Sequence, residues 1–482
     1  MTASTPPGPS KARLRRRQVL GAGGAAAASI GLWGCAPLPT TPSDTAEPAP
    51  PAPAAAPAGS APALPPAPTP MRAAAPTPST VVTPVLGRVV VIGGGFGGST
   101  VALYLRLWQP DIDVTLVERN EQFTSCPMSN LVLGGYRQLA DLTRPYTGLA
   151  AQGVKLVHGE AVAIDVAGRT VRLADGRSLP YDRLVVSPGV DFMTEQVAGL
   201  AAPAAQQGIL HGWKAGPQTL ALRQQLEDMP DGGVFAMTIP RAPYRCPPGP
   251  YERACMVAAY LKQNKPKSKV LVLDANPEVQ SKKALFERAF SQHYDGLLEY
   301  RPNAELKEVD AASRTARLEF ENVQADVLNV IPPQRAADIA RSAGLVTVNN
   351  RWVGVNWLTM ESLAVPGIHV LGDATFPGPG MPKSGHMANQ QAKVAAAAII
   401  QLQKGEAVNA TPVLVNTCYS YVTANEVAHV ASVHQYNAEL KGFTPVQGAG
   451  GVSTAASLLE GRYAWSWAQN IWADMLTPTP LT

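Results

Sequence analysis

Residues 88–98 read RVVVIGGGFGG, and this stretch decides the fold of the chain. The apolar, β-branched run before the glycines is typical of a buried parallel strand. Gly93, Gly95 and Gly98 fit the spacing G-x-G-x-x-G. In that spacing the first glycine allows a tight turn, the second lets the backbone approach a pyrophosphate, and the third lets helix and strand pack closely. The helical pattern over residues 99–107 then supplies an N-terminus that favours phosphate.

A second apolar strand, predicted over residues 113–117, ends at Glu118. A carboxylate at this point suits the two hydroxyls of an adenosine ribose and argues against a 2′-phosphate. Strand, glycine turn, helix, strand and acid in this order predict a dinucleotide-binding fold. We include Val162 among the expected cofactor-binding residues.

Two further segments indicate which dinucleotide binds. Residues 370–374 read VLGDA and precede a predicted helix over 388–403, and residues 184–189 read LVVSPG, a typical strand-to-glycine crossover between domains. In two-dinucleotide flavoproteins such an aspartate, here Asp373, lies on the ribityl chain. The next helix points its N-terminus at the pyrimidine edge of the flavin, where negative charge develops on reduction. The sequence therefore predicts FAD, rather than NAD, as the tightly held cofactor.

A second nucleotide-type scaffold follows, without a nucleotide turn. Strands are predicted over 233–239 and 269–273, with Asp274 after the second and a helix over 251–262 between them. The turn at 240–250 reads PRAPYRCPPGP, and prolines have no N–H and leave no room for a pyrophosphate. Cys246 instead lies before a helix N-terminus, where a thiolate is stabilised. We predict that this domain has exchanged nicotinamide binding for thiol chemistry.

The chain is therefore predicted to be an α/β protein. It has two Rossmann-like dinucleotide-binding domains of the glutathione-reductase type and a C-terminal domain. The expected boundaries are a signal at 1–35, an Ala/Pro-rich linker at 36–85, the FAD domain at 86–200 and 338–408, the second domain at 201–337, and the C-terminal domain at 409–482.

The N-terminal residues predict export. Residues 16–20 read RRQVL and precede a short Gly/Ala-rich run to Gly34, as in a twin-arginine (Tat) signal, and the run is too short for a dedicated membrane span. Residues 32–35 read LWGC, which resembles a lipobox with Cys35 as the acylated residue. A lipid anchor and a plain cleaved signal both remain open. The linker holds sixteen of the 45 prolines and suits a tether. We expect a periplasmic or exported protein.

Charge argues against a nucleic-acid partner. The chain has 40 bases and 36 acids, but five of the bases lie in residues 1–35, which have no acid. The rest of the chain thus holds 35 bases and 36 acids, without the basic excess of nucleic-acid proteins. We expect no nucleic-acid partner and no metal site.

Four cysteines remain when Cys35 is set aside: Cys126, Cys246, Cys255 and Cys418. They allow three full pairings, and spacing does not choose among them. A chain of this size does not need disulfides to stabilise its fold, so the cysteines favour a redox role. No C-x-x-C-H haem motif occurs in the sequence.

The chain resembles the flavoprotein subunit of flavocytochrome c sulfide dehydrogenase from about Arg88 to Met475. The resemblance rests on five blocks: 124–130 (TSCPMSN), 245–253 (RCPPGPYER), 331–335 (IPPQR), 381–385 (MPKSG) and 416–420 (NTCYS). It implies an 8α-thioether between Cys126 and FAD, and a redox-active disulfide between Cys246 and Cys418. It further implies oxidation of sulfide to sulfane sulfur and a heterodimer with a c-type cytochrome subunit. Cys255 departs from the family pattern, so a disulfide exchange between Cys246 and Cys255 remains open. Which cysteine faces the flavin also remains open.

Two residues have expected roles beside the flavin. Glu252 is a candidate acid/base for sulfide protons, or a first-turn carboxylate that the helix dipole favours. Lys383 is a candidate to stabilise the reduced flavin's N1/O2 charge. Three tryptophans at 465, 467 and 472 suit either a core or the centre of a partner interface.

Three other functions remain open. The chain could be a partner that reactivates a sulfur carrier in thiosulfate oxidation, or a sulfide:quinone oxidoreductase. The second has an amphipathic C-terminal anchor that should be cationic, whereas residues 463–474 contain no base. An NADH-dependent disulfide reductase is disfavoured by the missing glycine turn.

Overall fold

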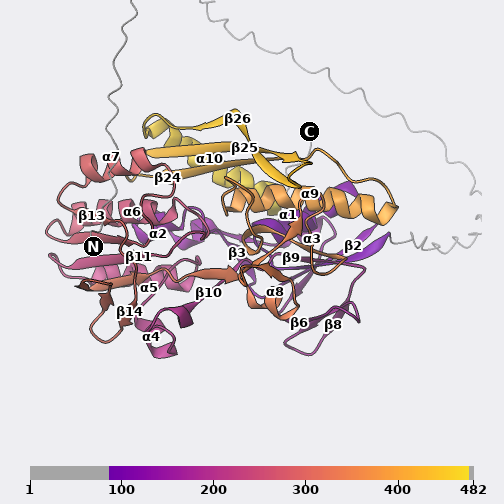
Figure 1. The fold of residues 1–482 in the computed structure, drawn as a ribbon, viewed down its shortest axis with the longest axis horizontal. Helices are drawn as coiled ribbons and strands as arrows, with labels where there is room; N and C mark the ends of the chain where they lie inside the picture. Colours follow the sequence, from indigo (N-terminus) through magenta and orange to yellow (C-terminus); the bar gives the residue numbers. More distant parts are fainter. Residues whose placement is uncertain (1–85, 477–482) are drawn as a thin grey trace, which may run out of the picture. The chain divides into compact units, whose positions relative to one another are not determined.

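A computed structural model describes residues 86–476. The signal expected at 1–35, with Cys35, and the linker expected at 36–85 lie outside the described residues. Figure 1 shows the described elements.

The first sheet has seven strands, in the order β21-β22-β23-β9-β1-β2-β5. β1 pairs in parallel with β2 and β9, and β5 and β23 extend the sheet in the same sense, whereas β21 and β22 form an antiparallel edge. Val89 and Val91 have no exposed surface and Val90 has 3%. Both faces of β1 are thus buried, as the run of β-branched residues predicts. The strands are β1 (Gly87–Ile92), β2 (Ile112–Glu118), β5 (Lys155–His158), β9 (Arg183–Val186), β21 (Val355–Asn356), β22 (Glu361–Ser362) and β23 (Ile368–Val370).

Two helices and a small sheet cover the first sheet. Helices α1 (Phe96–Trp108) and α9 (Gly385–Lys404) pack against each other. The antiparallel strands β6 (Ala161–Asp165), β7 (Thr170–Leu173) and β8 (Ser178–Pro180) lie on the other side (Figure 1). This is the layered arrangement of a dinucleotide-binding domain.

The glycine turn joins β1 to α1. Gly93 has φ +96°, a backbone conformation that residues with a Cβ rarely adopt. A Cβ on Gly98 would lie 1.8 Å from the carbonyl oxygen of Gly93. The helix begins at Phe96 rather than at the expected residue 99, so Gly98 sits inside the first turn and lets helix and strand approach.

The second sheet is parallel, in the order β13-β12-β11-β17. Alternate residues of β12 face different layers: Val270 and Val272 belong to the core that includes α6 and α7, whereas Leu271 and Leu273 pack with the small sheet β14-β15-β16. The strands are β11 (Val234–Ile239), β12 (Lys269–Asp274), β13 (Leu298–Arg301), β14 (Glu308–Asp310), β15 (Thr315–Arg317), β16 (Asn322–Gln324) and β17 (Val327–Val330). The helices are α5 (Pro217–Asp228), α6 (Gly249–Asn264) and α7 (Lys283–His293).

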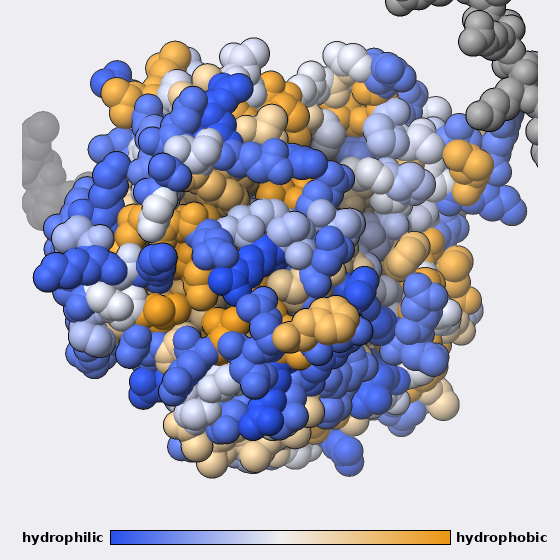
Figure 2. All heavy atoms as spheres, turned by 60° about the vertical axis from the view of Figure 1, so that its left-hand side comes forward, coloured by the Kyte–Doolittle hydropathy of each residue, from blue (hydrophilic) through white to orange (hydrophobic). Residues whose placement is uncertain are grey.

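The C-terminal residues form an antiparallel sheet, β24 (Val413–Tyr421), β25 (Val427–Asn437) and β26 (Gly442–Val452), followed by helix α10 (Leu458–Leu476). β24 contacts both α9 of the first domain and α6 of the second. This contact brings the C-terminal sheet to the junction of the two dinucleotide-type folds. Figure 2 shows that hydrophobic residues reach the surface among hydrophilic ones on one face of the molecule. The α/β class with two Rossmann-like domains is confirmed.

We expect the second and third glycines of the motif, Gly95 and Gly98, to respond differently to alanine. Gly98→Ala places its Cβ against the Gly93 carbonyl, so the free energy of unfolding should fall by about 2 kcal/mol or more, with or without flavin. Gly95→Ala is the matched control, because φ is −75° there and its Cβ meets nothing within 4 Å. It should weaken FAD binding but leave the flavin-free protein's urea unfolding unchanged. Equal unfolding curves for the two flavin-free variants would contradict this account of the turn.

Candidate active site

The acid after β2 lies at the glycine turn. Glu118 Oε2 accepts the N–H of Gly94 at 2.7 Å, and Oε1 accepts the N–H of Asn120 at 2.8 Å. Val162 lies at a bulge in the pairing of β6 with β7, and its side chain is 44% exposed. The structure thus places Glu118 where an adenosine ribose is expected, with Val162 on the adjoining small sheet.

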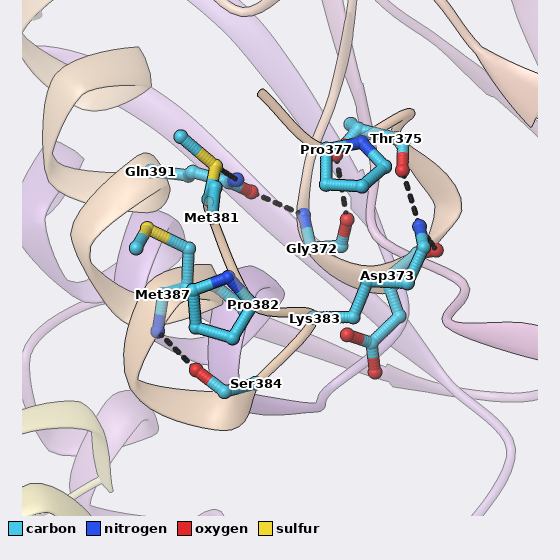
Figure 3. Close-up of a pocket in the computed structure, with 11 residues that line it drawn as sticks. Gly372, Asp373, Thr375, Pro377, Met381, Pro382, Lys383, Ser384, Met387 and Gln391 are labelled. Atoms are coloured by element: carbon cyan, nitrogen blue, oxygen red, sulfur yellow. Dashed lines mark hydrogen bonds between the residues drawn. The ribbon is translucent and has the colours of Figure 1, made fainter. Parts of the chain in front are cut away.

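Asp373 follows β23 and has an unpaired acceptor. Its Oδ1 is buried and has no hydrogen-bond partner among the described residues. The neighbouring Gly372 N–H is held by Gln391 Oε1 of α9 at 2.8 Å, and Figure 3 shows this pair beside Asp373. These residues and the start of α9 line a small pocket. A buried carboxylate oxygen without a partner fits a ligand hydroxyl, as the ribityl chain of FAD would supply.

Lys383 holds the loop around Asp373. Its Nζ donates to the carbonyl of Asp373 at 2.8 Å and to that of Thr375, and it lies 3.7 Å from the centroid of the Trp352 ring. Burial lowers the pKa of Lys383 to about 7. Two of its three N–H bonds are therefore engaged within the loop. Ser384 caps α9 by accepting the N–H of Met387 at 3.0 Å (Figure 3), and the helix N-terminus supplies positive potential at the site.

Cys126 lies on the turn between β3 (Gln122–Thr124) and α2 (Ser129–Leu133). Its Sγ accepts hydrogen bonds from Arg245 Nη2 at 3.2 Å and from the N–H of Ala215 at 3.4 Å. The sulfur is thus held by two donors from the second domain. Together with Glu118 and Asp373, it gives a donor and acceptor set that fits FAD.

The backbone of Cys246 is hydrogen-bonded to the loop that carries Asp373 and Lys383, residues 372–384, which we call the flavin loop. Its N–H donates to the carbonyl of Lys383 at 2.8 Å, and its φ is +56°. The expectation that the following helix stabilises a thiolate here is wrong. Burial raises the pKa of Cys246, and the negative charges of Cys418 and Glu252 raise it further. Helix α6 begins only at Gly249, and desolvation of the Cys246 sulfur outweighs the influence of the helix N-terminus.

Cys418 lies on β24 and is linked to the start of α9. Its Sγ lies 3.4 Å from Asn416 Nδ2, and the Oδ1 of Asn416 accepts the hydroxyl of Ser384 at 2.7 Å. Both Cys246 and Cys418 are free thiols in the structure. The disulfide between them stays a prediction. Cys255 is wholly buried within α6, and burial raises its pKa well above the ordinary value.

Lys282 is a site residue that the sequence analysis missed. Its Nζ donates to the carbonyls of Cys418 at 2.8 Å and Ala428 at 3.4 Å, and the residue is only 7% exposed. Burial lowers its pKa, while the charges of Cys418 and Glu252 act in the opposite direction. In the sequence it stands beside Lys283, which is exposed and pairs with Glu278 at 2.8 Å. Two adjacent lysines at a helix start look alike until the tertiary structure buries one of them.

Glu252 is a buried acid in the first turn of α6. Its Oε1 accepts the N–H of Tyr421 at 2.9 Å, and its Oε2 accepts Asn130 Nδ2 at 2.8 Å. Burial raises its pKa, although those hydrogen bonds and the charges of Lys282 and Arg253 oppose the shift. A carboxyl whose pKa is raised beside two thiols is suited to exchange a proton with them.

The second nucleotide-type fold has its ribose position filled from within. Asp274, at the end of β12, is fully buried. Its Oδ2 accepts the hydroxyls of Tyr251 at 2.7 Å and Tyr300 at 3.0 Å, and its Oδ1 accepts the N–H of Asn276 at 2.9 Å. The carboxylate that would bind a nicotinamide nucleotide is thereby occupied by the protein itself.

The tryptophans of α10 pack against other aromatic side chains of the chain. Trp472 is 2% exposed and packs edge-on against Trp465, with ring centroids 5.8 Å apart. Trp467 lies on another face, against His386 and Tyr419. Helix α10 also begins with exposed Leu458, Leu459 and Tyr463. Within residues 86–476, no helix is long and apolar enough to cross a membrane, and no cluster of ligating side chains suits a metal ion.

Three family models match the chain. Residues 219–332 match the central part of the sulfide dehydrogenase (flavocytochrome c) flavoprotein chain, and residues 410–476 match the flavin-binding part of flavocytochrome c sulphide dehydrogenase. Residues 87–228 match pyridine nucleotide-disulphide oxidoreductases. The flavoprotein chain of sulfide dehydrogenase from Chlorobaculum thiosulfatiphilum is 60% identical over 45 residues, which are 9% of this chain and 94% of that one. The chain belongs to the flavocytochrome c sulfide dehydrogenase flavoprotein family. The resemblance found in the sequence blocks is confirmed.

Relatives outside this flavoprotein family share the fold. The mitochondrial sulfide:quinone oxidoreductase of Mus musculus is 24% identical over 304 residues, which are 60% of this chain and 65% of the mouse protein. The chain thus spans less than two thirds of the length of that curated relative. The solved structure of sulfide:quinone oxidoreductase from Aquifex aeolicus has a TM-score of 0.64 at 19% identity, and covers 80% of this chain and 91% of that one.

The buried Glu252 predicts a pH-dependent stability. Its pKa is raised in the folded state, so its contribution to folding is full below the unfolded value of about 4.5 and is lost as pH rises through the folded pKa. Glu252→Gln has no such titration. The difference in unfolding free energy, variant minus wild type, should therefore increase with pH above 4.5, as measured by urea unfolding of the flavin-bound protein. Glu278→Gln, at an exposed ion pair, is the control, and a constant difference for Glu252→Gln would contradict the raised pKa.

Proposed function

We propose that this flavoprotein oxidises sulfide to sulfane sulfur through a disulfide between Cys246 and Cys418, and that the electrons leave to a c-type cytochrome. The proposal rests on the contacts that bring the segments of Cys246, Cys418 and Glu252 to the loop of Lys383 and the start of α9. Glu252 Oε1 accepts the N–H of Tyr421, three residues after Cys418 on β24. Cys246 touches the flavin loop through Lys383, and Cys418 is linked through Asn416 to Ser384 at the start of α9.

The protein's own groups account for the sulfur chemistry. HS⁻ attacks one sulfur of the disulfide, which leaves one cysteine as a persulfide and the other as a thiolate. Glu252, held by Asn130 and Tyr421, accepts the proton that sulfide brings. Lys282 supplies buried positive charge next to Cys418 as that thiolate forms. A second HS⁻ takes the outer sulfur of the persulfide away as HSS⁻, which leaves both cysteines reduced. The two cysteines return to the disulfide by giving up two electrons, which FAD, when bound, would accept and pass on one at a time.

The acceptor has one alternative that a specific observation favours. The sulfide:quinone oxidoreductases among the relatives share the fold over most of this chain, so a quinone is the second candidate. The match of residues 410–476 to the flavocytochrome family supports cytochrome c, as does apolar surface at the start of α10. There Leu458, Leu459 and Tyr463 are 62%, 53% and 52% exposed, which suits the heterodimer with a cytochrome subunit. Export through the Tat route accompanies this proposal.

Sulfide itself tests the function. Anaerobic sulfide should bleach the flavin of the wild-type protein rapidly. NADH should not, because the ribose position at Asp274 is filled by Tyr251 and Tyr300. Cys418→Ser should slow the bleaching roughly 100-fold, whereas Cys255→Ala should bleach as wild type does. Turnover with cytochrome c and with a water-soluble quinone then identifies the acceptor. Bleaching by NADH but not by sulfide would reject the proposal. Weak turnover with cytochrome c, with the protein purifying from its host without a haem-containing chain, would favour a role in reactivating a sulfur carrier.

The second part of the proposal is a covalent thioether between Cys126 and the 8α carbon of FAD. A fixed flavin of raised potential suits an enzyme that draws electrons from sulfide. Acid-precipitated wild-type protein should therefore stay yellow, and Cys126→Ser should release its FAD into the supernatant. Release of all FAD from the wild type would reject the thioether and leave the disulfide chemistry standing.

A further inference from the structure

Arg245 has no role in the sulfide chemistry proposed above, yet its side chain is directed at Cys126. Its Nη2 donates to Cys126 Sγ at 3.2 Å, and the N–H of Ala215 donates to the same sulfur at 3.4 Å. Hydrogen bonds from a guanidinium and a backbone amide stabilise negative charge on a sulfur and orient its lone pairs.

Hydrogen bonds of both its backbone and its guanidinium hold Arg245 in place. Its N–H donates to Gln334 Oε1 at 3.0 Å, and its carbonyl accepts Trp213 Nε1 at 3.3 Å. The guanidinium also donates to the carbonyl of Trp213. Trp213 and Ala215 belong to one segment, so the same stretch of chain fixes Arg245 and supplies the second donor to Cys126.

The charged surroundings place this guanidinium between the two parts of the site. Burial lowers the pKa of Arg245, but nearby Cys126 and Asp373 outweigh burial, and the pKa is raised. Lys214 adds a second cation near Cys126. Arg245 thus contacts Cys126 with its side chain and adjoins Cys246 in the turn at 240–250.

We propose that Arg245 is the positioning residue for covalent flavin attachment: it orients the Cys126 sulfur and stabilises its negative charge while the bond to the 8α carbon of FAD forms. This inference rests on the proposed thioether. Attack by a sulfur is faster when a neighbouring group holds the thiolate ready.

The attachment step balances with an external oxidant. The 8-methyl group loses one proton and the Cys126 thiol loses another as the C–S bond forms. The two electrons released remain on the flavin, which takes up two protons and leaves the step reduced. Molecular oxygen then accepts the two electrons and two protons as hydrogen peroxide, and the oxidised, covalently held flavin remains.

The test compares Arg245→Met with Arg245→Lys and with Arg241→Met. Arg241 is exposed in the same loop and pairs with Glu305 at 2.8 Å, so its variant is the matched control. Each full-length protein is made with ample riboflavin, and covalent and free FAD are measured after acid precipitation. A second preparation of each, made under riboflavin limitation and free of flavin, is treated with iodoacetamide at neutral pH. Mass spectrometry follows alkylation of Cys126.

Arg245→Met should hold total FAD near the control value but lower the covalent fraction about tenfold, and alkylation of Cys126 should slow about tenfold. Arg245→Lys should recover part of both effects. Unchanged covalent FAD and unchanged alkylation in Arg245→Met would overturn the inference. So would a loss of covalent and total FAD together with alkylation at the control rate, because Arg245 would then act only in binding. If wild type holds no covalent FAD, the thioether itself fails, and the alkylation rates still show whether Arg245 acts on the sulfur.

Discussion

A proline has no amide hydrogen, and the turn between β11 and α6 contains five prolines in eleven residues. This constraint removes the N–H groups with which a nucleotide fold holds a pyrophosphate. The position of the ribose is closed as well, because Asp274 is engaged by Tyr251 and Tyr300. A scaffold built for a second dinucleotide therefore presents a rigid loop, from which Arg245 and Cys246 project to two parts of the flavin site.

Buried charges of both signs meet around the thiols. Arg245 donates a hydrogen bond to the sulfur of Cys126, and Lys282 donates one to the backbone carbonyl of Cys418. Glu252 is buried between Asn130 and Tyr421. An isolated buried charge is costly, so groups of this kind persist when hydrogen bonds and opposite charges offset their desolvation. The arrangement leaves a carboxyl with a raised pKa and two ammonium or guanidinium groups around sulfur, which is the environment that thiol and disulfide chemistry needs.

The site depends on three segments that are far apart in the chain. The backbone of Cys246 reaches the carbonyl of Lys383, and Asn416 connects Cys418 to Ser384. The three segments meet at the start of α9. The flavin loop leads into this helix, the turn at 240–250 is hydrogen-bonded to the flavin loop, and β24 is hydrogen-bonded to Ser384. Because β24 also contacts α6, the C-terminal sheet packs against both dinucleotide-type domains.

Several features were determined by the sequence alone. The β-branched run and glycine spacing at residues 88–98 predict the first domain, because a strand buried on both faces and a turn without Cβ atoms leave a local signature. The prolines of 240–250 likewise predict the loss of a nucleotide turn. What only the tertiary structure decided is the electrostatics of the site. Lys282 and Lys283 are neighbours of the same type, and only packing buries the first beside Cys418. The thiolate expected at Cys246 from its place before a helix is reversed by burial and by the charges of Cys418 and Glu252. The contact of Arg245 with Cys126 joins residues 119 positions apart. Desolvation and long-range contacts of this kind have no local signature, because they depend on which segments the fold brings together.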